Sequence, residues 1–424
     1  MNILMMSNTF SPHVGGVARS IERFSRRYRY LGHHVKVVAP DFDGVPIDEP
    51  DVIRVPAIRH FNHTDFSVVL PIPHILKSAV EDFEPDVIHS HHPFLLGGTA
   101  LRVAHTHSLP LIFTHHTRYE DYTHNMPGDS QWMKRFVEKL ATHYANLCDQ
   151  VFVPSESVQE LVVERGVTTP VNVVPTGVEL DRFAFGSKQQ SRTAMGIPEN
   201  AFVVGHLGRL SQEKNIPFLI SSIIRFLQRT DHLGDTRCLI VGSGPMESMI
   251  KARFNEAELG NRLHMTGVLD SDDSISEAYH AMDVFAFASR SETQGMVITE
   301  AMAAGVPVVA LDAPGVREVV DSYTNGTLLM EENLNEFYKA LYNMARVDSV
   351  EYDRLSRGAR RTAEKYSMES TANTALELYS RLRNYDLAHR AVDYPLWVDT
   401  LHVIKSELEI LKSTAQSFSE SIKS

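Results

Sequence analysis

The sequence predicts an α/β protein built from two doubly wound parallel sheets, with a helical extension at the C-terminus. Its 424 residues exceed what one hydrophobic core usually organises, so we expect two domains. Short apolar runs alternate with helical stretches, and the pattern restarts after residue 171. This alternation is typical of parallel strands joined by crossover helices.

The first half contains five apolar runs that predict strands, at residues 2–7, 34–39, 85–89, 110–114 and 150–154. A helix is expected over residues 16–31, because Val17, Ile21, Phe24 and Tyr28 share one face. Further helices are expected over residues 97–105 and from Ser155 onward.

A strand at 171–175 leads into a linker at 176–185, which is rich in turn formers and has no helical period. We predict strands at 201–207, 238–241, 263–265, 284–286 and 308–310, and helices at 217–230, 245–257, 274–282 and 295–304. The predicted domains are residues 1–176, residues 177–370, and a segment 371–424 that packs back on the first domain. Because such sheets bind ligands at the carboxyl ends of their strands, we expect the two domains to face one cleft.

The composition excludes several classes of protein. A hydrophobic fraction of 43% argues against a mainly disordered chain, and a net charge of −12 argues against a nucleic-acid-binding protein. Two cysteines favour a reducing compartment. The sequence has no apolar run of about 20 residues and no export signal at its start, so we expect a cytoplasmic protein.

Histidines are concentrated in the first half, where 15 of the 21 lie between His13 and His143. Zinc is the alternative that such a bias raises. However, the histidine pairs lack neighbouring cysteines and H-E-x-x-H spacing, so we expect no metal cofactor.

The first candidate site is the loop that follows the first strand, where Gly15 and Gly16 open a helix. Free N–H groups at a helix start favour a phosphate, although glycines here also suit a simple turn. The loop is not G-x-G-x-x-G. The nearest match, residues 242–247, has Glu247 in place of the third glycine, which disfavours an NAD-dependent oxidoreductase.

Two cations, Arg209 and Lys214, lie on the loop that follows the first strand of the second half. Together they suit a diphosphate, because Arg binds phosphate through a fork and Lys adds a mobile charge. The competing interpretation is a solvated basic loop, and this loop alone does not decide between the two.

Two glutamates eight residues apart, Glu292 and Glu300, form the third candidate site. Either both lie on one helix face, or Glu292 lies at the N-terminus of the helix and Glu300 lies two turns further along it. The backbone N–H groups of Gly295, Met296 and Val297 are candidates to bind a phosphate or a hydroxyl. By itself, the pattern is more typical of two solvent-exposed carboxylates.

Taken together and in order, these motifs resemble the retaining glycosyltransferases of family 4, which have the GT-B fold of two Rossmann-like domains. The resemblance rests on Gly15–Gly16, Gly208–Arg209 with Glu213–Lys214, and residues 292–310. Residues 86–94, 113–124 and 292–295 look like the diacylglycerol glucosyltransferase branch of that family.

The resemblance implies a role for each matching residue. Arg209 and Lys214 would hold the diphosphate and stabilise the leaving group, Glu300 would bind the ribose, and Glu292 would bind the donor sugar. The remaining implied contacts are His116 near the reacting face of the sugar, the backbone of Gly15, Gly16, Gly295, Met296 and Val297 near phosphate or hydroxyl groups, Val268 near the base, and Tyr119 and Asp121 near the acceptor. His116, Glu292, Arg209 and Lys214 are the expected catalytic residues, and whether Glu292 or His116 contacts the transferred proton stays open.

The implied activity is transfer of a hexose from a nucleotide sugar, UDP-glucose, to a hydroxyl acceptor, with a lipid such as diacylglycerol as the acceptor. It also implies glycolipid biosynthesis and peripheral contact with the inner face of the membrane. The alternatives are a nucleotide-sugar epimerase or a sugar phosphorylase on the same scaffold, and a Rossmann oxidoreductase. Neither the nucleotide, the acceptor nor the oligomeric state follows from the residues.

Three further segments carry expectations. Residues 396–424 have helical spacing that suits packing on the first domain, a dimer seam or a membrane surface. The arginine-rich first helix, in which Arg19 departs from the expected small polar residue, is a second candidate membrane surface. Residues 270–273 imitate a metal-binding D-x-D, but we expect them to begin a helix capped by Asp273 or Ser274.

Overall fold

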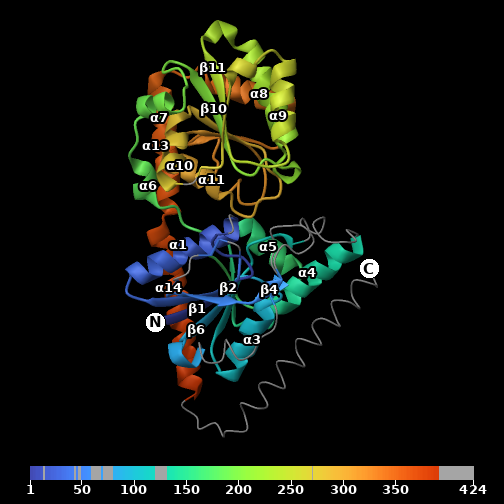
Figure 1. The fold of residues 1–424 in the computed structure, drawn as a ribbon, viewed down its shortest axis with the longest axis vertical. Helices are drawn as coiled ribbons and strands as arrows, with labels where there is room; N and C mark the ends of the chain where they lie inside the picture. Colours follow the sequence, from blue (N-terminus) through green and yellow to red (C-terminus); the bar gives the residue numbers. More distant parts are fainter. Residues whose placement is uncertain are drawn as a thin grey trace. The chain divides into compact units, whose positions relative to one another are not determined.

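The computed structural model describes residues 1–12, 15–42, 44–45, 49–58, 68–69, 80–119, 131–269 and 271–390. The chain divides into two units (Figure 1). The first unit comprises Met1–Gly177 and the chain from Met368 onward, and the second comprises Val178–Ser367.

The first unit is organised around a seven-stranded parallel sheet in the order β3-β2-β1-β6-β7-β8-β9. Its strands are β1 (Asn2–Met6), β2 (His34–Pro40), β3 (Val52–Val55), β6 (Val87–Ser90), β7 (Leu111–Thr114), β8 (Gln150–Val153) and β9 (Val171–Val173). A separate antiparallel pair joins β4 (Ala57–Ile58) to β5 (Val68–Val69).

Helices cover both faces of this sheet, which explains why its strands are apolar runs without alternation (Figure 1). The helices are α1 (Gly16–Tyr30), α3 (Leu96–Thr106), α4 (Gln131–Ala145), α5 (Glu156–Glu164) and α14 (Met368–Arg390). One face packs against α1 and α14, which meet through the rings of Tyr28 and Tyr379 with centroids 5.8 Å apart. The other face packs against α3, α4 and α5.

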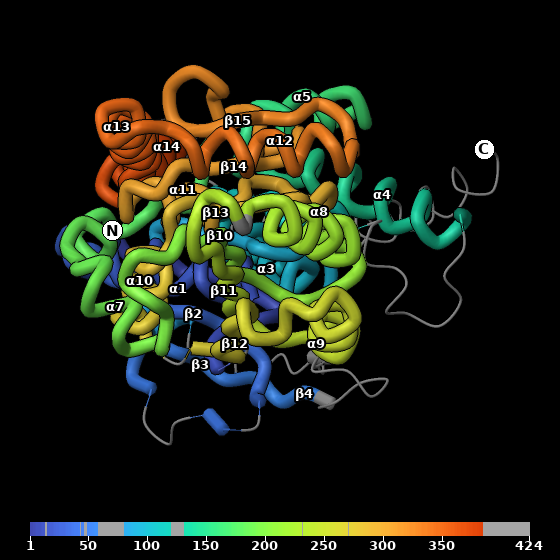
Figure 2. The backbone as a smooth tube through the Cα atoms, turned by 90° about the horizontal axis from the view of Figure 1, so that it is seen from above, coloured from blue at the N-terminus to red at the C-terminus, as the bar shows by residue number. Residues whose placement is uncertain are grey.

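The second unit contains a six-stranded parallel sheet in the order β12-β11-β10-β13-β14-β15, which Figure 2 shows across the unit. Its strands are β10 (Phe202–Leu207), β11 (Thr236–Val241), β12 (Leu263–Gly267), β13 (Val284–Phe287), β14 (Val308–Leu311) and β15 (Gly326–Leu329). Chain order therefore runs outward in one direction from β10 to β12, and then outward in the other direction from β13 to β15.

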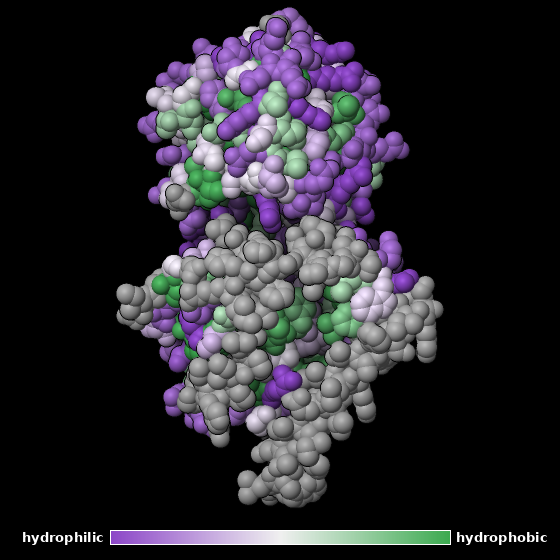
Figure 3. All heavy atoms as spheres, turned by 45° about the vertical axis from the view of Figure 1, so that its right-hand side comes forward, coloured by the Kyte–Doolittle hydropathy of each residue, from purple (hydrophilic) through white to green (hydrophobic). Residues whose placement is uncertain are grey.

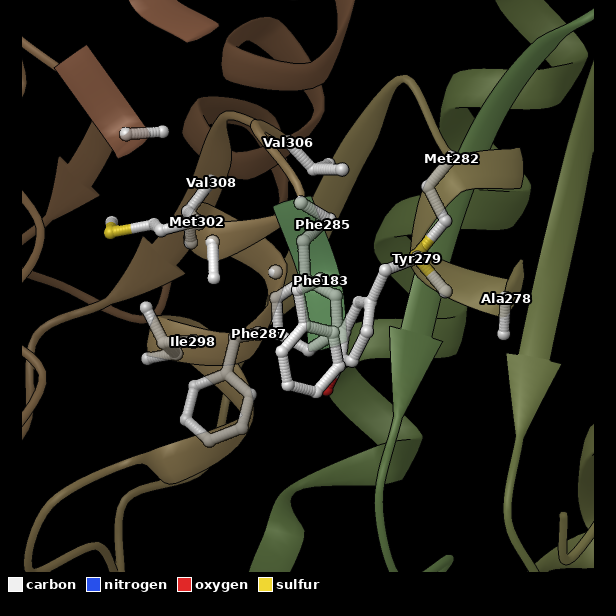
Figure 4. Close-up of a cluster of buried hydrophobic side chains, with 14 of the residues drawn as sticks. Phe183, Ala278, Tyr279, Met282, Phe285, Phe287, Ile298, Met302, Val306 and Val308 are labelled. Carbon is white, nitrogen blue, oxygen red and sulfur yellow. The ribbon is translucent and has the colours of Figure 1, made fainter. Parts of the chain in front are cut away.

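Two hydrophobic layers enclose this second sheet. Its helices are α6 (Leu180–Ala184), α7 (Lys188–Ala194), α8 (Ile216–Arg229), α9 (Glu247–Glu256), α10 (Asp272–Ala281), α11 (Met296–Ala303), α12 (Leu334–Met344) and α13 (Ser349–Lys365). One layer is formed with α8, α9 and α12, and the other with α6, α10, α11 and α13. In the second layer, the rings of Phe183, Tyr279, Phe285 and Phe287 lie side by side (Figure 4). The face of this unit visible in Figure 3 is mainly hydrophilic, with small separate apolar areas.

The α/β class and the two parallel sheets are confirmed, but two local expectations were wrong and some strands were not predicted. The expected linker contains α6, which is anchored by the buried ring of Phe183. The cap of α10 is Ser271, whose side chain accepts from the Ser274 N–H, and neither Asp273 nor Ser274 has that role. Strand β15 was not predicted, because Asn325 and Gly326 look like a turn. The glycine is needed there, since a Cβ at Gly326 would lie 2.0 Å from the Val308 carbonyl oxygen.

The expected crossover helix near residues 371–384 is part of α14. The predicted extension at 396–424 lies outside the described residues. No helix in the described part of the chain is long and apolar enough to cross a membrane.

A buried charge network fixes α7 to the second sheet and provides a stability test. The carboxylate of Asp283 accepts from the Arg192 guanidinium at 2.5 Å, from the Val203 N–H at 2.6 Å and from the Lys188 ammonium. Asp283→Ala should lower the free energy of unfolding by about 3 kcal/mol, because the buried Arg192 loses its counter-charge. Urea denaturation followed by circular dichroism measures this change.

The control is Glu336→Ala, which breaks the exposed Glu336–Lys339 pair on α12 and should leave stability unchanged. Equal effects of the two substitutions would contradict a structural role for the Asp283 network.

Candidate functional site

The strand order of the second unit reverses between β10 and β13, which are neighbours in the sheet although β11 and β12 separate them in sequence. Crossover helices on either side of such a point leave the carboxyl ends of the two strands open to a ligand. Arg209 and Lys214 follow β10, and Glu292 and Gly295 follow β13. The fold therefore brings two of the predicted motifs to one place.

Lys214 and Glu292 form an ion pair at this point, with Lys214 Nζ 2.5 Å from Glu292 Oε1. Both side chains are mostly buried, with exposures of 23% and 13%. The two loops are also joined where the Ser291 hydroxyl donates to the Glu213 carbonyl oxygen at 3.3 Å. The ion pair therefore places charges of both signs where the strand order reverses.

Arg209 is exposed on the same loop and adds a second positive charge. Burial would raise the pKa of Glu213, but the nearby Ser211 hydroxyl and backbone N–H, with the charges of Arg209 and Lys214, lower it instead. The loop therefore combines an exposed guanidinium with a mostly buried ammonium.

Gly295 caps α11 in the left-handed conformation, with φ of 70°. That conformation favours glycine, and no side chain at this position caps the helix. The N–H groups of Met296 and Val297 lie in the first turn, where helical N–H groups have no acceptor within the helix. This end of α11 is therefore suited to an anionic or hydroxyl group.

Glu300 lies inside α11, whereas Glu292 lies in the loop before it, so the two glutamates do not share one helix. The Glu300 side chain is buried, and its Oε2 accepts from the Tyr279 hydroxyl at 2.9 Å. Tyr279 is itself packed edge-on against Phe183, as Figure 4 shows. Glu300 is thus a positioned carboxylate and not an exposed one.

The remaining loops at this edge pack tightly through glycines. A Cβ at Gly242 would lie 2.0 Å from the Gly208 carbonyl oxygen, and one at Gly244 would lie 2.4 Å from the Leu210 carbonyl oxygen. These glycines therefore permit loop packing, which accounts for the incomplete dinucleotide motif. Val268 follows β12 and is half exposed.

A residue that the sequence did not reveal, His206, lies on β10 beneath this site. Its Nδ1 lies 3.1 Å from the Ala286 carbonyl oxygen, so Nδ1 carries the proton. Burial lowers the pKa of His206 to about 4, and the ring is therefore neutral at pH 7. Its position in an apolar strand run gave no signal of this contact.

In the first unit, the strand order reverses between β1 and β6. Gly15 precedes α1 with an extended backbone and no side-chain cap, and Gly16 is the first residue of the helix. The loops after β1 and β6 are joined where the Asn8 N–H donates to His92 Nδ1 at 3.2 Å.

His116 lies in the loop after β7, with its Nε2 2.9 Å from His91 Nδ1. Burial, followed by the nearby rings of His92, His89 and His115, holds the pKa of His116 well below its usual value. The cavity beside this pair has a volume of about 10 Å³ and is lined by side chains that include Ser20, His89 and Thr176. It has room for about one water molecule, and not for a sugar.

Tyr119 is buried, and its ring packs edge-on against Phe94 and His115 with centroids 5.6 Å and 5.5 Å apart. Burial raises the pKa of its hydroxyl. Asp121, the other residue expected near the acceptor, lies outside the described residues.

The sequence also did not reveal the hydrogen bonds of His89, a neighbour of the His91–His116 pair. His89 is buried, with Nε2 2.6 Å from the Thr114 hydroxyl and Nδ1 2.6 Å from the Tyr379 hydroxyl. The histidine bias was the available signal, but Tyr379 is 290 positions away in the sequence. Within the described ranges, no three His, Cys, Asp or Glu side chains are grouped so as to hold a metal ion.

Two family models together match most of the chain. A family model described as Glycosyltransferase Family 4 matches residues 14–182, and one described as Glycosyl transferases group 1 matches residues 187–361. The chain is 29% identical over 346 residues to an alpha-monoglucosyldiacylglycerol synthase of Streptococcus pneumoniae, covering 78% of this chain and 76% of that protein. It is 28% identical over 349 residues to a GDP-mannose-dependent alpha-mannosyltransferase of Mycobacterium tuberculosis, covering 78% of this chain and 84% of that protein.

The structure is similar to that of a sucrose-phosphate synthase from Thermosynechococcus elongatus, with a TM-score of 0.72 and 20% identity. The likeness covers 90% of this chain and 98% of the other. At this level of identity it describes the fold alone.

The hydrogen bond between Tyr279 and Glu300 provides a test of this site that needs no ligand. Tyr279→Phe should lower the free energy of unfolding by about 1 kcal/mol, because the buried carboxylate loses a donor. The matched control is Tyr323→Phe, since Tyr323 is 85% exposed and its substitution should change nothing. Equal stability of the two variants in chemical denaturation would contradict the described contact.

Proposed function

Because the chain belongs to the glycosyltransferases of family 4 and has their GT-B fold, we propose that it transfers glucose from UDP-glucose to a hydroxyl group of diacylglycerol, with retention of the anomeric configuration. The observation that carries the donor part is the Lys214–Glu292 pair at the point where the strand order of the second unit reverses. The acceptor and the glucose are supported by the name of the Streptococcus pneumoniae relative.

In this proposal, the donor replaces the internal ion pair. The diphosphate attracts the Lys214 ammonium and the Arg209 guanidinium, and Glu292 becomes able to accept hydrogen bonds from sugar hydroxyls. As the bond between the anomeric carbon and the phosphate oxygen breaks, negative charge grows on the diphosphate. Cations already in place stabilise this charge, which is usually the largest electrostatic contribution to catalysis.

The other residues bind the remaining parts of the donor and the acceptor. Glu300, oriented by Tyr279, binds the ribose hydroxyls, and the first-turn N–H groups of α11 bind a phosphate or hydroxyl oxygen. The backbone at Val268 faces the base. His116 and Gly16 of the first unit act near the sugar and the phosphate, and Tyr119 and Asp121 act near the acceptor.

The chemistry proposed here uses no metal ion, because the two cations supply the charge that a divalent ion would otherwise provide. Removal of divalent ions with EDTA should therefore leave the initial transfer rate unchanged. A rate that falls on chelation and returns with Mg²⁺ or Mn²⁺ would contradict this part of the proposal.

The direct test of the function is a transfer assay with labelled nucleotide sugars, including UDP-glucose and GDP-mannose, against diacylglycerol vesicles and soluble acceptors. We expect an α-glucosyl lipid from UDP-glucose, with the anomer assigned by NMR. A product formed from another donor or acceptor would replace the proposed substrate. Epimerised donor formed without acceptor would contradict the proposal that the protein is a transferase.

The role of the ion pair is tested by Lys214→Ala, which should lower kcat at least about 100-fold, because a charge that stabilises the leaving group is lost. The matched control, Lys339→Ala, removes a 60% exposed lysine that also pairs with a glutamate, and should leave kcat unchanged. Full activity of the Lys214→Ala variant with every nucleotide sugar would remove the donor-site assignment.

Glu300→Ala should act differently and raise the KM for the donor about tenfold or more, because the ribose hydroxyls lose a charged acceptor. Steady-state kinetics over a range of donor concentrations separates this effect on KM from an effect on kcat. An unchanged donor KM would exclude Glu300 from the donor site.

A further inference from the structure

His91 and His116 form a pair of imidazoles whose two contacting nitrogens lie 2.9 Å apart. His91 directly follows β6, and its backbone N–H donates to the Met6 carbonyl oxygen at 3.0 Å. His116 belongs to the loop after the adjacent strand β7. The distance is that of a hydrogen bond, and it joins Nδ1 of His91 to Nε2 of His116.

Both rings are neutral at pH 7. Burial is the main cause that lowers the pKa of each, and the neighbouring histidines lower it further. A neutral imidazole carries one proton, so one ring of the pair donates and the other accepts. The tautomer of His116 is therefore coupled to that of His91.

The surroundings of His91 indicate which ring donates. His91 is 1% exposed, and its Nε2 has no hydrogen-bond partner among the described protein groups. If His116 donated, His91 would carry its proton on this buried Nε2, and a buried N–H without an acceptor is costly. If His91 donates through Nδ1, its Nε2 keeps only a lone pair, which is less costly to leave unpaired than a buried N–H.

The ring of His91 also packs against the ring of a third histidine, His89. The His89 ring lies against it with centroids 4.2 Å apart, and His89 is fixed by Thr114 and Tyr379. The His91 and His116 rings are stacked with centroids 5.2 Å apart. His91 therefore has little freedom to turn its Nδ1 away from His116.

We propose that His91 is a positioning residue that keeps His116 as the tautomer with its proton on Nδ1, so that His116 offers the substrate a hydrogen-bond donor and not a base. The catalytic consequence rests on the proposed function, in which His116 acts near the donor sugar. An Nδ1–H at that place binds an oxygen of the sugar or the phosphate. It does not take the proton of the acceptor hydroxyl.

The tautomer is measured on the full-length protein labelled with ¹⁵N-histidine, without donor, by NMR correlation of ring nitrogens with carbon-bound ring protons. A His116→Gln variant identifies the His116 signals. We expect the shift of a protonated nitrogen at Nδ1 and of an unprotonated nitrogen at Nε2. The reverse pattern, or averaged shifts, would overturn the proposal.

Two substitutions of His91 then separate orientation from packing. His91→Leu removes the donor, so the His116 tautomers should average and kcat should fall about tenfold with the donor KM unchanged. His91→Asn places an amide near the position of Nδ1, and it should restore both the Nδ1 proton of His116 and most of kcat. The control His34→Asn changes an exposed histidine of β2 and should affect neither measurement.

Thermal unfolding shows whether each variant is folded. If His91→Leu does not fold, the wild-type spectrum and His91→Asn decide the question. A folded His91→Leu variant with an unchanged His116 tautomer or an unchanged kcat would overturn the proposal. If the wild-type protein transfers no sugar from any nucleotide donor, the proposed function fails, and the NMR pattern still tests the His91–His116 coupling by itself.

Discussion

The reversal of strand order in a parallel sheet is the constraint on which the donor site of this protein depends. Each strand must be followed by a crossover that returns over one face of the sheet. At β10 and β13 the crossovers leave on opposite faces, so their loops meet at the sheet edge. A lysine and a glutamate separated by 78 positions become an ion pair there. The chemistry of the site thus follows from topology as much as from residue type.

The ion pair also explains how charged groups remain ready for a ligand without one being bound. A mostly buried ammonium with no counter-charge would be costly, and so would an unpaired carboxylate. Each group neutralises the other in the free protein, and a diphosphate offers the ammonium a stronger partner. Tyr279 donates a hydrogen bond to the buried Glu300 carboxylate, and the packed rings of Figure 4 hold Tyr279 in place.

The strands could be predicted because each is a short apolar run buried on both faces, and the motifs could be placed because they follow those runs directly. What the sequence did not reveal depends on partners that lie far away in the chain. Tyr379 reaches His89 across 290 positions, and α6 forms because Phe183 is buried under Tyr279. Gly326 looks like a turn residue until the Val308 carbonyl lies against it. The interpretation of Glu300 as an exposed carboxylate was wrong for a similar reason, since its partner Tyr279 comes from another helix.

Recognition of a nucleoside diphosphate through Lys214 is the central claim, and a titration calorimetry comparison of UDP with UMP, and of GDP with GMP, tests it most directly. For the nucleotide pair that binds, the account predicts that the diphosphate binds at least about tenfold more tightly than the monophosphate, as one additional charge-assisted contact would give. The same account predicts that Lys214→Ala removes most of this difference. Equal affinities in the wild-type protein, or a difference that survives the substitution, would contradict it.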